Sequence, residues 1–244
     1  MNNCYRILMT ALCLLVLSPI YALPNDSARV FNREHPLIYE DAWDLWPYSF
    51  LNASGEAVGY NIDLIKSICD ELDIPYVIKL KPTKEALRDV KNGEADLMLA
   101  MDADYHREYG HFGQSVVQIF THSVLRRKND PLRIKTEDDL KTSHFIVHDG
   151  SFAHHLMKRQ GLENHVMPYN DMREAVQDIH NKPNQQIVWN TLSLKWLKRT
   201  LHFDDLELTP VKMQHGEYKF LSNQPILLEI IDEVYSHMEA EGKL

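Results

Sequence analysis

The sequence is poor in glycine and cysteine and has no excess of basic residues. Of its 244 residues, 9 are Gly, 11 are Pro and 3 are Cys. These counts exclude collagen-like and low-complexity chains. The formal net charge of −9 gives the chain no general affinity for phosphate backbones, so we expect no nucleic-acid partner. With 44% apolar residues, the chain can form one large globular domain or two small ones.

Sequence patterns of common enzyme classes are also missing. The chain has no Gly-x-Ser-x-Gly motif, no Walker loop and no dinucleotide-binding glycine pattern, so we expect neither catalysis nor a cofactor. After residue 22 the chain contains one cysteine, Cys69, which excludes an internal disulfide there. Because Cys69 lies among apolar residues at helical spacing, we expect a buried thiol and not a nucleophile.

Long apolar runs are confined to the N-terminus. Arg6 precedes an almost unbroken apolar run over residues 7–17, and Ala22 offers a small residue for cleavage. The run is too short to span a bilayer comfortably. Residues 1–22 are therefore predicted to be a secretory signal peptide and the remaining chain to be periplasmic. An uncleaved N-terminal anchor is the alternative.

Strand-like and helix-like segments alternate through the rest of the chain, which predicts α/β architecture. Residues 126–133 are polar and contain a proline, as in a connector between two groups of elements. We therefore predict two α/β lobes with a cleft between them. Strands are expected at 37–40, 76–80, 95–100, 116–126, 144–148, 165–169, 186–189, 206–211 and 218–221, and helices at 61–73, 83–92, 151–160, 171–180, 192–201 and 224–240.

A series of short motifs runs along the chain in a characteristic order. They are Tyr48-Ser-Phe50, Gly55, Gly59-Tyr-Asn-Ile-Asp63, Gly93-Glu-Ala-Asp96, and Arg107 followed by Phe112. Their order and spacing over residues 36–240 resemble the extracellular solute-binding proteins of family 3. This family includes the polar-amino-acid binding proteins of ABC transporters and related sensor domains. The resemblance implies the type II periplasmic binding fold (a Venus flytrap) and capture of a solute by closure of the cleft.

The resemblance also implies a division into lobes. Residues 23–125 plus 213–244 would form lobe 1, and residues 126–212 would form lobe 2 as an insertion. The connectors near 126–130 and 211–214 would then be the hinge.

Arg107 falls where the family places the arginine that binds a ligand carboxylate. A guanidinium group matches a carboxylate in bidentate geometry. A surface arginine paired with a neighbouring acid is the alternative. Asp102 and Asp104 stand before Arg107, where relatives have small hydroxyl residues. If both acids face the cleft, they neutralise the arginine and repel an anionic solute.

Two further site elements follow from the resemblance. Gly150 and Ser151 end a strand and begin a helix, where free backbone N–H groups favour an anion. An ordinary helix cap at Ser151 is the alternative. The family's aspartate for a ligand ammonium would fall at Asn190, whose amide supplies no counter-charge. Either Asp102 or Asp104 supplies that charge from the other lobe, or the preferred solute lacks an ammonium.

Aromatic residues follow the first predicted strand. Trp43, Trp46 and Tyr48 lie where the family packs an aromatic wall against its ligand. Such rings give apolar contact and hold a cation over a ring face. The alternative for each is that it covers lobe 1, and Tyr48 is the strongest candidate by position.

The 13 histidines form no tight zinc pattern such as His-Glu-x-x-His, so we expect no metal. The milder alternative is a pH-sensitive ligand affinity, because histidine titrates near neutrality.

The predicted function is a periplasmic solute-binding module for a small polar solute, amino-acid-like or carboxylate. It would serve transmembrane signalling or ABC-type uptake, and the domain would be a monomer when isolated. The partner would be a membrane sensor kinase that continues the same chain, or an ABC permease. Asn190, and a chain end at Leu244 that stops short of the usual family ending, favour the sensor. A dehydratase-like periplasmic enzyme on the same fold is the alternative.

Overall fold

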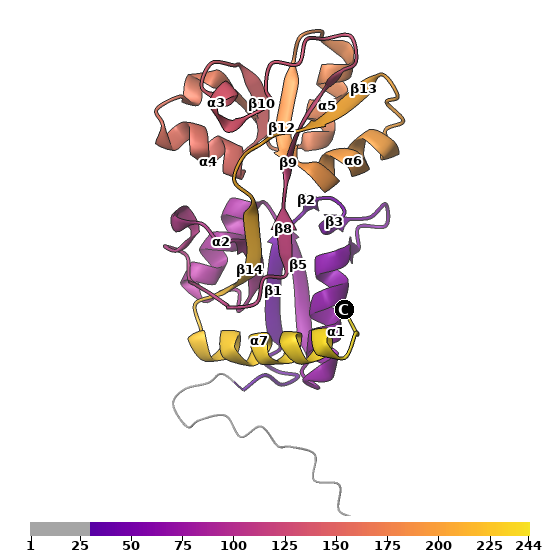
Figure 1. Cartoon of the computed structure of the whole chain (residues 1–244). Helices are drawn as coiled ribbons and strands as arrows, with labels where there is room; N and C mark the ends of the chain where they lie inside the picture. The colour runs from indigo at the N-terminus through magenta and orange to yellow at the C-terminus, as the bar shows by residue number, and fades with distance from the viewer. Residues whose placement is uncertain (1–29) are drawn as a thin grey trace, which may run out of the picture.

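The computed structural model describes residues 30–244, and the predicted signal peptide at 1–22 lies outside them. Two lobes stand one above the other in Figure 1, and each combines β-strands with surrounding helices. Within the described residues, no helix combines the length and the apolar character that crossing a membrane requires.

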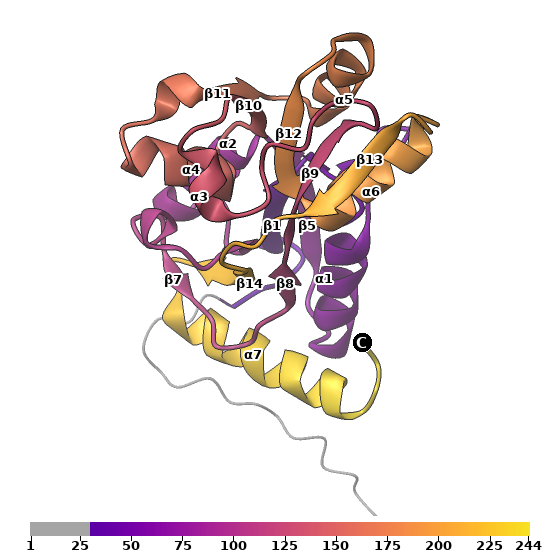
Figure 2. The same ribbon diagram turned by 45° about the horizontal axis from the view of Figure 1, so that its top comes forward.

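Lobe 1 contains the first and last described parts of the chain, including the long helix that runs across its base in Figures 1 and 2. One group of strands is parallel and the other antiparallel, and a bridge between Tyr39 and Leu97 joins them. The parallel pair is β1 (Leu37–Ala42) and β5 (Tyr76–Lys81). The antiparallel strands are β6 (Met98–Met101), β7 (His111–Phe112), β8 (Gln118–Phe120) and β14 (Gly216–Ser222). The helices are α1 (Tyr60–Glu71), α2 (Thr83–Asn92), α7 (Pro225–Ala240) and the 3-10 turn η1 (Asp104–His106). A small sheet after β1 consists of β2 (Asp44–Leu45), β3 (Ser49–Leu51) and β4 (Ala57–Val58).

Lobe 2 has one five-stranded sheet in the order β11-β10-β12-β9-β13. Its central strands are parallel, and β9 is antiparallel to both of its neighbours. The strands are β9 (His122–Arg127), β10 (Phe145–His148), β11 (Val166–Tyr169), β12 (Gln186–Asn190) and β13 (Leu206–Pro210). The helices are α3 (Glu137–Leu140), α4 (Phe152–Arg159), α5 (Met172–Asn181), α6 (Thr191–Thr200) and the 3-10 turn η2 (Glu163–His165).

Helices α1 and α2 form where apolar residues recur at helical spacing. In α1, the side chains of Ile62, Ile65, Ile68 and Cys69 are fully buried in the core of lobe 1. Burying one such aliphatic side chain contributes about 1.5–3 kcal/mol. Helix α2 ends at Gly93, whose φ of 76° is left-handed and favours glycine.

The environment of Cys69 makes its reactivity predictable. Burial, and then the negative charge of Asp70, raise the pKa of the Cys69 thiol to about 12. For protein that starts at residue 23, we expect no thiol to react with Ellman's reagent in the folded state. After denaturation without reductant, one thiol per chain should react. A value near zero would show that Cys69 is bonded to another chain or modified.

The chain passes from lobe 1 to lobe 2 at Thr121, between β8 and β9, and returns through residues 211–215. The backbone N–H of Val211 donates to the carbonyl of His122 at 3.0 Å, so the two crossings lie side by side. The single strand predicted at 116–126 is therefore wrong, because it divides between two sheets.

The connector predicted at 126–133 begins inside β9 and lies wholly in lobe 2. Arg126 is paired with both neighbouring strands, and its guanidinium donates to the carbonyls of Arg127, Lys128 and Asp130 at 2.8–3.0 Å. The lobe boundary predicted between residues 125 and 126 thus falls within a paired strand, and the first crossing lies at Thr121 and not near 126–130.

Candidate functional site

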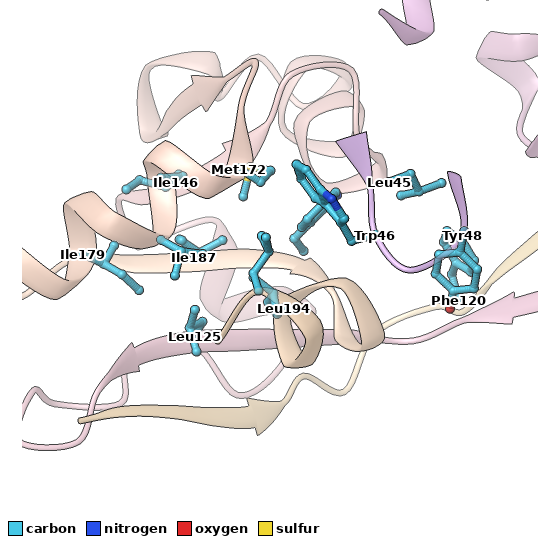
Figure 3. Close-up of a cluster of buried hydrophobic side chains, with 14 of the residues drawn as sticks. Leu45, Trp46, Tyr48, Phe120, Leu125, Ile146, Met172, Ile179, Ile187 and Leu194 are labelled. Atoms are coloured by element: carbon cyan, nitrogen blue, oxygen red, sulfur yellow. The ribbon is translucent and has the colours of Figure 1, made fainter. Parts of the chain in front are cut away.

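The largest buried apolar cluster of the described residues joins the two lobes, and we call it the interlobe core. The aromatic segment after β1 contacts α5 and α6 of lobe 2, where Arg173 lies over Trp46 and Trp196 packs on Phe50. Figure 3 shows Trp46 between Met172 and Leu45, with Tyr48 on Phe120. Lobe 1 contributes Ala42, Leu45, Trp46, Tyr48, Met101 and Phe120; lobe 2 contributes Leu125, Ile146, Met172, Ala175, Val176, Ile179, Ile187, Trp189, Leu194, Leu197 and Leu206.

Trp46 is 4% exposed and illustrates how the lobes meet. The guanidinium carbon of Arg173, on α5, lies 5.0 Å from the centre of its ring. A guanidinium over an indole face is favourable, and more so when both groups are shielded from water. Lobe 2 therefore holds Trp46 in place through apolar packing and through the Arg173 guanidinium.

A column of aromatic rings lies at the crossing between the lobes. Tyr48 stacks on Phe120 with ring centroids 4.8 Å apart, and Phe120 stacks on Tyr218 at 3.9 Å. Phe120 ends β8, directly before Thr121. Burial raises the pKa of Tyr48 to about 12, against the opposing effect of a hydrogen bond from the Asn190 side chain. The Tyr48 hydroxyl thus contacts lobe 2, while its ring packs on Phe120 at the end of β8.

A buried ionisable pair also joins the lobes. Nε2 of His148, at the end of β10, lies 2.9 Å from Oδ2 of Asp44 in β2. The Asp44 side chain is 2% exposed, and the His148 ring lies 5.2 Å from the ring of Trp189. A buried carboxylate is costly unless it is paired. Asp44 therefore depends on lobe 2 for its partner.

A second polar link lies beside the predicted anion site at the start of α4. Lys84 Nζ of lobe 1 lies 2.7 Å from Oδ2 of Asp149, whose other oxygen is 3.1 Å from His154 Nδ1. Burial acts against ionisation of Asp149, but the hydrogen bond and charge of Lys84 give a net lowering of its pKa. The N–H of Gly150 donates to His154 Nδ1 at 3.1 Å, and Ser151 Oγ accepts from the His154 N–H at 3.4 Å. Both predicted anion-binding groups therefore already have partners within lobe 2.

The three residues around the predicted arginine clamp form a separate cluster. Asp102 pairs with Arg107 through one oxygen and with Lys219 Nζ, at 3.0 Å, through the other. The Arg107 side chain is 56% exposed, and that of Asp104 is 92% exposed with Oδ1 3.8 Å from Arg107 Nε. Asp102 is thus neutralised by two cations, one of which, Lys219, comes from a strand near the end of the chain.

The structure brings some predicted site residues together and separates others. Trp46, Tyr48 and Asn190 meet between the lobes, where Asn190 Oδ1 also accepts from the backbone N–H of Ser193 at 2.9 Å and caps α6. Trp43 is half-buried, and its backbone N–H donates to the backbone carbonyl of Lys81.

The sequence analysis overlooked four residues of this region. They are Asp44, its partner His148, and the aromatic residues Phe120 and Trp189. The one signal was position: Asp44 stands between Trp43 and Trp46, and His148 precedes Asp149-Gly150-Ser151.

Comparison with solved structures identifies the fold. A histidine kinase sensor domain with similarity to periplasmic binding proteins matches at a TM-score of 0.77 and 17% identity, over 85% of this chain and 92% of that one. The arginine-bound form of truncated ArgBP from T. maritima matches at 0.72 and 17%, over 83% and 95%. An ABC uptake transporter substrate binding protein from Streptococcus pneumoniae with bound histidine matches at 0.73 and 17%, over 85% and 88%. The fold is therefore that of type II periplasmic binding proteins, as predicted.

Sequence comparison gives the family. A search of curated proteins finds no match. Residues 42–244 match the bacterial extracellular solute-binding proteins, family 3, which covers most of the described chain. The family and the two neighbours with bound arginine and bound histidine are binding proteins. The chain thus belongs to the bacterial extracellular solute-binding proteins of family 3 and is a flytrap-type solute-binding domain.

Proposed function

We propose that this chain captures a small polar solute, amino-acid-like or carboxylate, between its lobes, and that the resulting closure serves transmembrane signalling. The observation that carries the proposal is the buried Asp44–His148 pair, which needs both lobes. Together with the interlobe core, it gives the contact between lobes a defined geometry. A solute that binds to both lobes will favour this arrangement by its differential affinity.

Signalling is favoured over uptake by the chemistry at Asn190. The resemblance implies an aspartate there for a ligand ammonium, whereas the Asn190 amide is neutral and caps α6. A histidine kinase sensor domain is among the structural neighbours. ABC-type uptake is the second candidate, favoured by neighbours with bound arginine and histidine. The partner is correspondingly a sensor kinase or an ABC permease.

The proposal also covers the location, the oligomeric state and the catalytic role of the domain. We infer that the signal peptide at 1–22 directs the chain to the periplasm and that the isolated domain is a monomer. We assign it no catalytic role, and the dehydratase-like alternative is tested by assaying turnover of any solute that binds.

A thermal-shift screen of amino acids, small carboxylates and amines, followed by calorimetry, tests solute binding. If Arg107 leaves Asp102 to bind a solute carboxylate, Arg107→Ala will weaken carboxylates about tenfold or more and leave plain amines unchanged. Arg88→Ala, an exposed arginine on α2, is the matched control.

Asn190→Asp should improve amino-acid binding in the same calorimetry, because the new carboxylate restores a counter-charge for the ligand ammonium.

Each result has a clear reading. Unchanged carboxylate affinity in Arg107→Ala would remove this residue from the site. Failure of every solute in the screen would contradict the proposed function itself.

A further inference from the structure

One aromatic contact between the lobes includes a titratable ring. Tyr105, in η1 of lobe 1, stacks on His155, in α4 of lobe 2, with ring centroids 3.8 Å apart and an interplanar angle of 12°. His106 lies edge-on to both rings, at 4.4 Å from Tyr105 and 6.2 Å from His155. Helix α4, which carries His155, lies on the same side of the molecule as α2 of lobe 1 (Figures 1 and 2).

Both rings project from ordered elements of their own lobes. His106 Nδ1 lies 2.8 Å from the carbonyl oxygen of Met101, and the Tyr105 hydroxyl lies 3.8 Å from the Met101 sulfur. On the other side, Ser151 caps the N-terminus of the helix that carries His155. The stack is therefore a contact between two ordered surfaces and changes only when the lobes move apart.

The charges around His155 oppose a proton on its ring. Lobe 1 presents Lys84 and His106, while His154 and Lys158 lie on the same helix as His155. The nearby acids are otherwise engaged: Asp149 pairs with Lys84, and Asp104 is mostly in solvent beside Arg107. His154 and Lys158 remain next to His155 when the lobes separate, whereas Tyr105, Lys84 and His106 do not.

We propose that the Tyr105–His155 stack is an acid-sensitive contact that regulates closure: a neutral His155 holds the lobes together, and its protonation separates them. This regulation rests on the proposed function, because it controls access to the same solute site. A tyrosine face attracts a cation only weakly. The cost of holding an imidazolium out of water beside Lys84 and His106 is larger.

The direction of the pH effect follows from the His155 pKa in the closed form, the arrangement in Figure 1. Burial, then His106, His154, Lys158 and Lys84, lower the pKa of His155 from 6.5 to about 4. The closed form is thus fully favoured above pH 6.5 and loses stability as the pH falls from 6.5 toward 4. The lowered pKa values of His106 and His154 act in the same sense as that of His155.

The test measures the distance between lobes directly, without a solute. Fluorescent labels on Glu94→Cys and Asn164→Cys, both exposed and on different lobes, report closure, since native Cys69 is buried. Between pH 7.5 and 5, we expect the closed-to-open ratio of the labelled protein to fall about tenfold. In His155→Phe, which keeps a ring against Tyr105 but does not titrate, the fall should shrink to less than about threefold.

Two controls and a second variant make the result decisive. His144→Phe changes an exposed histidine elsewhere on lobe 2, and Tyr105→Phe keeps the stacked ring, so both should respond as the wild type does. Tyr105→Ala should favour the open form already at pH 7.5, with folding checked by circular dichroism. Equal pH responses of wild type and His155→Phe would overturn the inference. Because no solute is present, that outcome is separate from a failed solute screen.

Discussion

Alanine in place of Asp44 is expected to shift the labelled protein from the closed toward the open form by roughly 30-fold or more. Removing one partner of a buried, hydrogen-bonded pair costs about 2–5 kcal/mol, much of it from the group left behind. Here that group is His148, which would lose the carboxylate 2.9 Å away and remain beside Trp189. The same interlobe fluorescence measurement at pH 7.5 reports the shift, and any solute found in the screen should lose affinity in parallel.

The size of the Asp44 effect is checked against two variants. Asp138→Ala removes a carboxylate from α3 whose side chain is 87% exposed, so closure should stay as in wild type. Asp44→Asn keeps an oxygen that accepts from the imidazole but loses the charge, and its effect should lie between the other two. If Asp44→Ala closes as readily as Asp138→Ala, the pair does not hold the lobes together.

Alanine in place of Asp41 is expected to lower the free energy of unfolding by about 3 kcal/mol at pH 5. Asp41 is 1% exposed at the end of β1. Its side-chain oxygens contact the Tyr39 hydroxyl at 2.6 Å, Asn61 Nδ2 at 2.8 Å and the backbone N–H of Ala42 at 2.7 Å. Asn61 Oδ1 in turn accepts from Gln118 Nε2 at 3.0 Å, so the network reaches β8, the strand before the crossing at Thr121. The substitution leaves several buried donors without an acceptor, and urea unfolding measures the loss.

The same residue predicts how stability varies with pH. Burial raises the pKa of Asp41 from 3.8 to about 6, against the opposing hydrogen bonds from Tyr39 and Asn61. The folded protein therefore holds this proton over a pH range in which the unfolded chain has released it. Stability from this group is fully present below pH 3.8 and is lost as the pH rises through 6, by about 2–3 kcal/mol in total.

Asp41→Ala removes that dependence, so its destabilisation should be smaller at pH 7.5 than at pH 5. The control is Asp70→Ala, an exposed carboxylate on α1 whose effect should stay within about 0.5 kcal/mol. A urea midpoint for Asp41→Ala that matches Asp70→Ala at both pH values would contradict the role of the network.

Much of the fold could be predicted because its signals are local. Helix α1 follows from apolar residues one turn apart, and α2 ends at Gly93 because glycine adopts a left-handed φ without steric cost. The short helix α3 was not predicted, although its capping box, Thr136 with Asp139, is a local signal. The division of the apolar run at 116–126 between β8 and β9 has no local signal, because both halves are equally suited to a strand.

By itself, the sequence determined the α/β alternation, the buried Cys69 and an aromatic loop that follows β1, together with a family resemblance over most of the chain. Each of these depends on residues within one helical turn, one strand or one short motif. The tertiary structure alone decided that Arg107 shares Asp102 with Lys219, that Asp44 pairs with His148 and that Tyr105 stacks on His155. The Asp44–His148 partners are separated by 104 residues. Such pairs leave no local pattern, because they exist only once both lobes have folded and their surfaces meet.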